Sequence, residues 1–264
     1  MSEETPATTH PKSRLRLLSY NIQVAVASTR LRHYITQSWK HVLPHPKSFS
    51  NLDKIADITA QYDMVALQEV DGGSLRSQFV NQVEYLADKA GFPFWYQQTN
   101  RNLGKLAQHS NGFLSHIQPA EVTEHRLPGL VPGRGAIVIR FGATHQHLVL
   151  ILAHLALGKR ARMTQLNYIA EITNQHEHVV VMGDLNCQPH SKEIRTLLQS
   201  THLTPPPTNE GTFPSWQPRR KLDYIFTSEG LTVHTAHVLK HVVSDHLPLA
   251  VEISLPDKVN VLAR

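Results

Sequence analysis

The feature that most constrains this 264-residue chain is an apolar run that stops abruptly at a polar turn. Residues 179–182 are mainly β-branched, which is typical of a strand buried on both faces. Gly183, Asp184, Leu185 and Asn186 follow, so a turn places a carboxylate and an amide together at a strand end. These oxygen donors suit a hard divalent cation or a phosphoryl group. Gly, Asp and Asn also form ordinary turns, so the stretch alone fits either interpretation.

Polar side chains also lie at or near one end of other predicted strands. These residues are Asn21, Glu69, His154 and Asp223, and a loop before the final strand adds Asp245 and His246. A single Asn or His at a strand end is usually structural, but a carboxylate there is costly to bury unless a partner such as a metal ion accompanies it. Adjacent Asp and His side chains can divide the work, one holding a metal ion and the other exchanging a proton. We therefore predict a cleft where the strand ends meet.

The order of the predicted elements indicates an α/β fold with two packed sheets and helices outside them. Helices are predicted over residues 51–62, 75–90 and 191–199, with a further helix that begins near Arg160. Strands are predicted over residues 15–21, 63–70, 92–96, 111–115, 136–141, 147–155, 178–183, 221–226 and 249–253. Consecutive prolines within residues 201–220 argue against regular structure there.

The composition, with 41% hydrophobic and 18% charged residues, is that of a globular protein with a substantial core. Neither a low-complexity linker nor an internal repeat divides the chain. We expect one domain over residues 13–256, with flexible tails at residues 1–12 and 257–264. A lone cysteine, Cys187, forms no internal disulfide and is expected to pack as a small buried hydrophobe.

A formal charge of +5 favours anionic partners such as phosphate esters, nucleic acid or acidic lipid headgroups, without choosing among them. The chain has no apolar run long enough to span a membrane and no secretory signal, so we expect a cytoplasmic protein, monomeric by default. Residues 29–50 interleave basic and aromatic side chains, which could grip a phosphate-bearing substrate. A solvated surface insertion is the simpler interpretation of that segment.

Taken in order, several independent motifs resemble the endonuclease/exonuclease/phosphatase superfamily, which includes DNase I, neutral sphingomyelinases and inositol polyphosphate 5-phosphatases. The motifs are Asn21, Gln68-Glu69-Val70, His154, Gly183-Asp184-Leu185-Asn186, Leu222-Asp223-Tyr224 and Ser244-Asp245-His246. The resemblance covers residues 15–254, and the sequence around His154 looks closest to that of small uncharacterised bacterial members.

This resemblance implies a four-layer α/β sandwich and Mg²⁺- or Mn²⁺-dependent hydrolysis of phosphate esters. It implies that the metal ligands are Glu69, Asn21 and Asp245, and that the catalytic residues are His154, Asp184, Asn186, Asp223 and His246. Asp184 with Asn186 would position water and phosphate, while Asp223 would orient His246. Residues with implied supporting or substrate-contact roles are Asn111, Arg162 and Gln165.

The reaction that the resemblance implies is in-line attack of water on phosphorus by a phosphodiesterase, of the nuclease type or the lipid-headgroup type. Nuclease members often carry an acid two positions after the first Asn, where this chain has Gln23, and this departure weakens the nuclease assignment and any two-metal site. The alternative is a catalytically weak member that acts as a binding module for nucleic acid or acidic lipid. Hydrolysis of a phosphodiester would separate the two.

Overall fold

The computed structural model describes residues 14–25, 48–102, 104, 106–129, 132–143, 146–259 and 261. The predicted N-terminal tail and the basic, aromatic segment up to residue 47 lie outside these ranges. Val259 and Val261, within the predicted C-terminal tail, are buried against the core between the sheets. The described part of that tail therefore packs with the folded protein.

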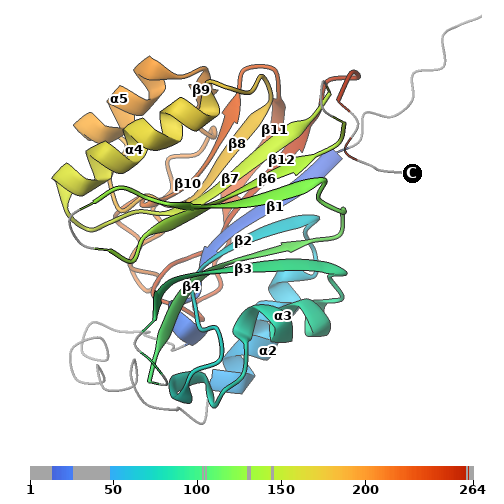
Figure 1. Ribbon diagram of the computed structural model, residues 1–264, viewed down its shortest axis with the longest axis vertical. Helices are drawn as coiled ribbons and strands as arrows, with labels where there is room; N and C mark the ends of the chain where they lie inside the picture. The colour runs from blue at the N-terminus through green and yellow to red at the C-terminus, as the bar shows by residue number, and fades with distance from the viewer. Residues whose placement is uncertain are drawn as a thin grey trace, which may run out of the picture.

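Two six-stranded sheets pack face to face, with helices on their outer faces (Figure 1). The first sheet has the order β11 (Thr232–Val238), β12 (Leu249–Ser254), β1 (Arg14–Asn21), β2 (Met64–Val70), β4 (Gln108–Ser115) and β3 (Phe94–Asn102). The second has the order β5 (Glu121–Arg126), β6 (Gly135–Phe141), β7 (Leu148–His154), β8 (Val179–Asp184), β10 (Asp223–Ser228) and β9 (Leu203–Thr204). Each sheet has one parallel pair among the described strands, β1 with β2 and β7 with β8.

Apolar side chains form three layers of core, which explains the sandwich. One cluster lies between the sheets. A second lies under α4 (Lys159–Thr173) and α5 (Lys192–Ser200), and a third lies under α2 (Ser48–Thr59) and α3 (Gln82–Ala90). The predicted four-layer α/β sandwich is therefore confirmed. No helix within the described ranges is both long and apolar enough to cross a membrane.

The register of the strands brings the predicted site residues into line. In the first sheet Asn21 lies opposite Gln68, next to Glu69. In the second sheet Asp184 lies between His154 on one side and Asp223 on the other. Because parallel neighbours end at the same edge of a sheet, each parallel pair delivers its polar residues to one place.

Several predicted elements differ from the structure. Residues 75–90 form no continuous helix: a short 3-10 turn (η3, Leu75–Ser77) is followed by Gln78 and Phe79, both in the left-handed conformation. The helix α3 starts only after Asn81, whose side chain accepts hydrogen bonds from the backbone N–H groups of residues 83 and 84. The strands β5, β9 and β11 were not predicted, and β3 is longer than residues 92–96.

Candidate active site

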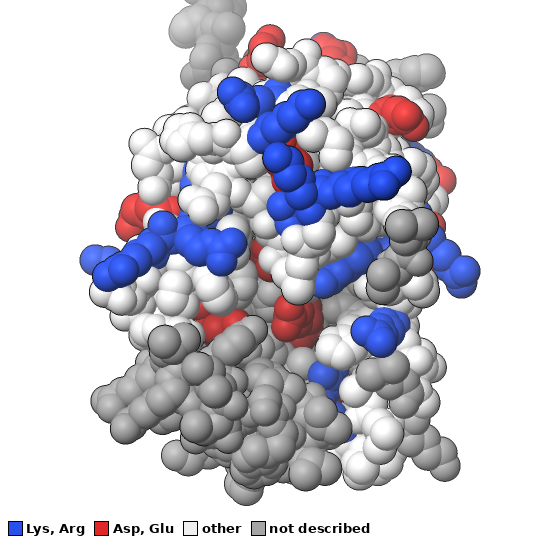
Figure 2. Space-filling view, turned by 90° about the vertical axis from the view of Figure 1, so that its left-hand side faces the viewer, with Lys and Arg blue, Asp and Glu red and all other residues white. Residues whose placement is uncertain are grey.

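The candidate active site lies at the side of the molecule where the C-terminal end of β1 points, which is the left side in Figure 1. Figure 2 shows this face, where acidic side chains reach the surface with Lys and Arg side chains around them. A face of mixed charge such as this can receive a metal ion and an anionic group side by side.

Gly183 sets the direction in which the Asp184 side chain leaves β8. Its φ is 138°, and a Cβ at this position would lie 1.9 Å from the carbonyl oxygen of Ala153, so only glycine fits here. The carboxylate of Asp184 is buried and accepts hydrogen bonds from the Asn186 backbone N–H at 2.9 Å and from Asn21 Nδ2 at 3.1 Å. Burial raises the pKa of Asp184 to about 7, so this carboxyl group binds a proton more readily than an exposed one.

Asn186 completes the turn beside Asp184 and is not a free amide. It adopts a φ of 54°, which Asn tolerates better than most residues. Its Nδ2 donates to the carbonyl oxygen of Leu155 at 3.0 Å. The side chain therefore ties the end of β8 to the chain that leaves β7.

Glu69 reaches the site because β2 is irregular near its C-terminal end. The pairing of β2 with β4 shifts register between Leu67 and Val70, and Glu69 has a φ of 55°. Asn21 Nδ2 lies 3.3 Å from Glu69 Oε1 and also contacts Asp184. One amide from the first sheet therefore links a carboxylate of its own sheet to a carboxylate of the second.

His246 and Asp223 form a buried pair. His246 Nδ1 lies 2.8 Å from Asp223 Oδ2, and Nε2 lies 3.8 Å from Asp184 Oδ2. Burial opposes the charged ring, but Asp223 and Asp184 outweigh it and raise the pKa of His246 to about 10. At neutral pH the ring is therefore an imidazolium with its Nε2–H directed at the site.

The loop that carries Asp245 is fastened to β1. Ser244 Oγ donates to the carbonyl oxygen of Asn21 at 2.7 Å, and the Ser215 backbone N–H donates to the Asp245 carbonyl at 2.7 Å. Burial raises the pKa of Asp245 to about 6, and the negative charge of Glu69 adds to this effect although His246 opposes it. Ser244 therefore holds this loop at the C-terminal end of β1, where Asn21 lies.

This set of residues fits a divalent cation. Burial, together with the charges of neighbouring carboxylates, raises the pKa values of Asp184 and Asp245, and a cation would stabilise both groups by neutralising them. Asn21 turns Nδ2 toward Glu69 and Asp184, while its Oδ1 accepts a hydrogen bond from the Gln23 backbone N–H at 3.2 Å. Metal-ligating atoms of Asp184, Asp223 and His246 lie within 4.8 Å of one another, close enough to share an ion. Within this group, Asp223 and His246 are already joined by a hydrogen bond.

His154 lies between the carboxylates, and Arg134 covers it. Its Nε2 is 3.6 Å from Asp184 Oδ2 and 3.8 Å from Glu69 Oε1, while Arg134 Nη1 lies 2.8 and 2.9 Å from the two ring nitrogens. Burial, followed by the charges of Arg134 and His246, holds the pKa of His154 well below its usual range. The ring is therefore neutral and makes no ion pair with either carboxylate.

The three residues with implied supporting or substrate-contact roles have partners outside this cluster. Asn111 is fully buried and donates from Nδ2 to the Gly135 carbonyl at 3.1 Å. Arg162 Nη2 pairs with Glu193 at 2.9 Å, and its Nη1 donates to the Leu157 carbonyl. Gln165 Oε1 accepts from the Ala156 backbone N–H at 2.9 Å. Their positions favour bracing of loops beside the site over contact with a substrate.

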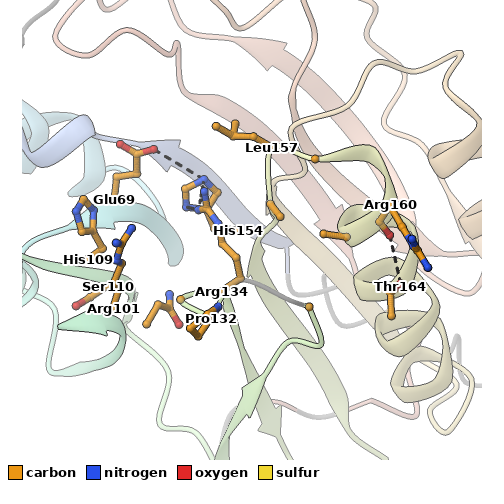
Figure 3. Close-up of a pocket in the computed structure, with 16 residues that line it drawn as sticks. Glu69, Arg101, His109, Ser110, Pro132, Arg134, His154, Leu157, Arg160 and Thr164 are labelled. Carbon is orange, nitrogen blue, oxygen red and sulfur yellow. Dashed lines mark hydrogen bonds and ion pairs between the residues drawn. The ribbon is translucent and has the colours of Figure 1, made fainter. Parts of the chain in front are cut away.

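A cavity of about 870 Å³ opens from the cluster, with Glu69 and His154 at one end (Figure 3). Its lining also includes Arg101, His109 and Arg134, none of which the sequence analysis identified. The sequence feature that could have pointed to Arg134 is its position between Gly133 and Gly135, just before the strand predicted over residues 136–141. Such a cavity is large enough for a drug-sized molecule.

Two mixed six-stranded sheets with helices outside, and acidic and histidine side chains gathered where strands end, define a DNase I-like architecture. The sequence profile of the Endonuclease/Exonuclease/phosphatase family matches residues 18–246, and the chain belongs to this family. Members of the family hydrolyse phosphate esters. Every residue of the predicted site lies within the matched range.

Solved structures with the same fold come from distant organisms. An endonuclease/exonuclease/phosphatase of Beutenbergia cavernae DSM 12333 superposes with a TM-score of 0.72 at 19% identity, over 92% of this chain and 72% of that chain. A mannosyl-6-phosphatase of Bacteroides thetaiotaomicron VPI-5482 gives 0.67 at 17%, over 91% and 100%. The human Nocturnin catalytic domain with bound sulfate gives 0.67 at 20%, over 92% and 94%. No match was found among the curated proteins.

Proposed function

We propose that this protein is a Mg²⁺- or Mn²⁺-dependent hydrolase of phosphate esters, acting on phosphodiesters by in-line attack of water. The observation that carries the proposal is the convergence of Asn21, His154 and His246 on Asp184. Glu69 joins this group through its contacts with Asn21 and His154. Burial of so many ionisable groups together costs free energy of folding, and binding of a metal ion would offset that cost.

Glu69, Asn21 and Asp245 would hold the metal ion, which supplies charge for a phosphate oxygen and for the leaving alkoxide when bound. Asp184 would accept a proton from water as that water forms a bond to phosphorus and the ester oxygen departs with its electron pair. The raised pKa of Asp184 supports this role, because a base works best when its pKa is close to the working pH. The hydrogen bonds from Asn21 and Asn186 would keep its carboxylate oriented.

His246 would donate from Nε2 to a phosphate oxygen. The hydrogen bond from Nδ1 to Asp223 fixes the ring plane and stabilises the charge that the donation requires. His154, which is neutral and covered by Arg134, would contact the phosphate from the opposite side. Charge would therefore be neutralised on several oxygens of phosphorus at once, which is the main requirement of phosphoryl transfer.

The test is hydrolysis of bis-p-nitrophenyl phosphate and p-nitrophenyl phosphate with Mg²⁺, with Mn²⁺ and with EDTA. We expect metal-dependent hydrolysis, faster for the diester, that falls by at least about a hundredfold in Asp184→Asn and in Glu69→Gln. The matched control is Asp57→Asn, a change on the exposed face of α2 that should leave activity unchanged.

Calorimetric titration of Mg²⁺ or Mn²⁺ separates the roles of the two carboxylates. Glu69→Gln should lose metal affinity, while Asp184→Asn should keep most of it. Faster hydrolysis of the monoester would reassign the protein to phosphomonoesterases. Folded wild-type protein without activity on either ester would favour the binding-module alternative. The cytoplasmic location and the monomeric state stay predictions.

A further inference from the structure

Three arginines line the cavity, and two of them, Arg101 and Arg134, lie toward the end that holds Glu69 and His154 (Figure 3). Within the described residues, Arg101 and Arg134 form no ion pair, in contrast to the paired Arg76, Arg140 and Arg162. Burial lowers the pKa of Arg134, and the positive charge of Arg101 lowers it further, although Glu69 and Asp184 oppose this. Guanidinium groups that share one cavity repel each other, and an anion bound between them would remove this repulsion.

Local structure brings the backbone next to Arg134 close to the side chain of Arg101. Gly133, with a φ of 108°, packs on the stem of Arg101, because a Cβ at Gly133 would lie 3.2 to 3.6 Å from the Cβ, Cδ and Cγ atoms of Arg101. Arg134 follows Gly133 directly and reaches His154. Arg101 is a cross-strand neighbour of His109, which also lines the cavity. The pair is therefore a consequence of sheet register and of one glycine contact.

Figure 3 shows how the pair lies relative to the catalytic cluster. Arg134 points up to His154, and Arg101 lies on the side of the cavity that holds His109 and Glu69. Among the described residues that line this cavity, Glu69 is the one carboxylate, and it belongs to the predicted metal site. The rest of the lining offers positive charge and no negative charge to a ligand.

We propose that Arg101 and Arg134 form a second anion subsite, which binds a phosphate group of the substrate other than the one that is cleaved. The inference rests on the proposed function, because it takes the cluster around Asp184 as the place of cleavage. Guanidinium groups bind phosphate through paired hydrogen bonds, and a phosphate between the two would remove their repulsion. The substrate class is then a phosphate ester that carries a second phosphate nearby on the same molecule.

The test uses a matched pair of chromogenic substrates, the p-nitrophenyl esters of thymidine 5′-phosphate and of thymidine 3′,5′-bisphosphate. For the wild type, the second phosphate should lower KM by about tenfold or more. In Arg101→Gln this gain should fall to less than about threefold, while kcat/KM for the monophosphate ester stays unchanged. Arg195→Gln, on α5 and outside the cavity lining, is the control and should keep the full gain.

A binding measurement that needs no catalysis accompanies the kinetics. The midpoint of thermal unfolding of metal-free protein is measured with fructose 1,6-bisphosphate and with fructose 6-phosphate. In the wild type and in Arg195→Gln, fructose 1,6-bisphosphate should raise the midpoint more than fructose 6-phosphate does. In Arg101→Gln the two sugar phosphates should raise it equally. A gain with the thymidine esters alone would assign the subsite to nucleotides, and a gain in both experiments would assign it to paired phosphates in general.

The outcomes separate the two proposals. If neither ester is hydrolysed but the bisphosphate stabilises the wild type and not Arg101→Gln, the proposed function is wrong and the anion subsite is retained. If the esters are hydrolysed with equal KM values and the two sugar phosphates act alike, the proposed function is retained and the second subsite is overturned.

Discussion

Among the described glycines, Gly183 is the one at which an added Cβ would make the closest contact. In Gly183→Ala the new methyl group would collide with the Ala153 carbonyl and force β7 and β8 apart. We expect a loss of at least about 2 kcal/mol in the free energy of unfolding, measured with urea, because backbone strain and a steric clash add. Gly91→Ala is the control, since Gly91 also has a positive φ but has open space around it. An equal loss in both variants would contradict the steric explanation.

The charge on His246 depends on Asp223. In Asp223→Asn the nearest negative charge is removed, so the pKa of His246 falls from its raised value of about 10. The wild type should therefore stay active until the pH approaches 10, while the variant should lose activity at a pH at least one unit lower. We also expect kcat to fall by about a hundredfold, because the ring loses its orientation. The measurement is kcat/KM against pH, and an unshifted basic limb would count against this pairing.

At the residue scale, the sequence predicted polar groups at strand ends and in the loop before β12, and it missed the arginines that line the cavity. Asp184 and Glu69 were identifiable because a carboxylate after a buried apolar run needs an explanation. Arg101 was not, because its position in the cavity depends on the register of β3 with β4 and on contact with Gly133. Neither relation is contained in the residues around position 101.

A network of hydrogen bonds around Asp71 holds the turn that follows the irregular end of β2. Asp71 follows Glu69 by two residues and is buried, with its carboxylate 2.8 Å from Arg76 Nε and 2.7 Å from both Ser74 N and Ser74 Oγ. Burial opposes the charge on Asp71, but Ser74 and Arg76 outweigh it and hold its pKa below the usual range. This network fixes the chain on the C-terminal side of Glu69.

Asp71→Asn tests the network. It removes the buried carboxylate charge that pairs with Arg76 Nε, so we expect the free energy of unfolding to fall by about 3 kcal/mol or more. Glu252→Gln removes a surface ion pair with Arg14 and should cost less than about 1 kcal/mol. Urea unfolding of the three proteins measures both values. Similar losses in the two variants would show that burial of the pair is unimportant.

Elements with buried apolar patterns were predictable, and elements that face solvent were not. The strand β8 was found because each of its residues is buried. The strands β5 and β11 are largely exposed and polar, so they lack the apolar signal. The predicted helix over residues 75–90 failed because Phe79 fits the apolar spacing, yet its side chain is 63% exposed and its φ is positive.

At the scale of the whole molecule, a group of histidines lies at the end of the second sheet opposite to the site. His147 Nε2 is 3.2 Å from His176 Nδ1, and His178 immediately precedes β8, whose other end carries Asp184. Burial and, next, the charge of His147 lower the pKa of His176, and burial likewise lowers that of His178. The folded protein therefore binds protons on these rings less readily than the unfolded chain.

This difference predicts that acid weakens the fold through these rings. A histidine with a lowered pKa in the folded state contributes stability above its unfolded value near 6.5, and this contribution is lost as the pH falls below that value. His176→Gln should therefore lose less stability than the wild type between pH 7 and pH 5. Urea unfolding at several pH values measures the slope. An identical slope in both proteins would remove His176 from the explanation.

The strand β12 lies between β1 and β11, and the loop just before it carries Asp245 and His246. The strand β1 therefore gains β12 as its neighbour, and the cluster gains Asp245 and His246, only after the chain has been synthesised as far as β12. A nascent polypeptide that ends before β12 would contain Asn21, Glu69 and Asp184 but would lack Asp245 and His246. Catalytic competence should therefore arise late and all at once, and it can serve as a reporter of finished folding.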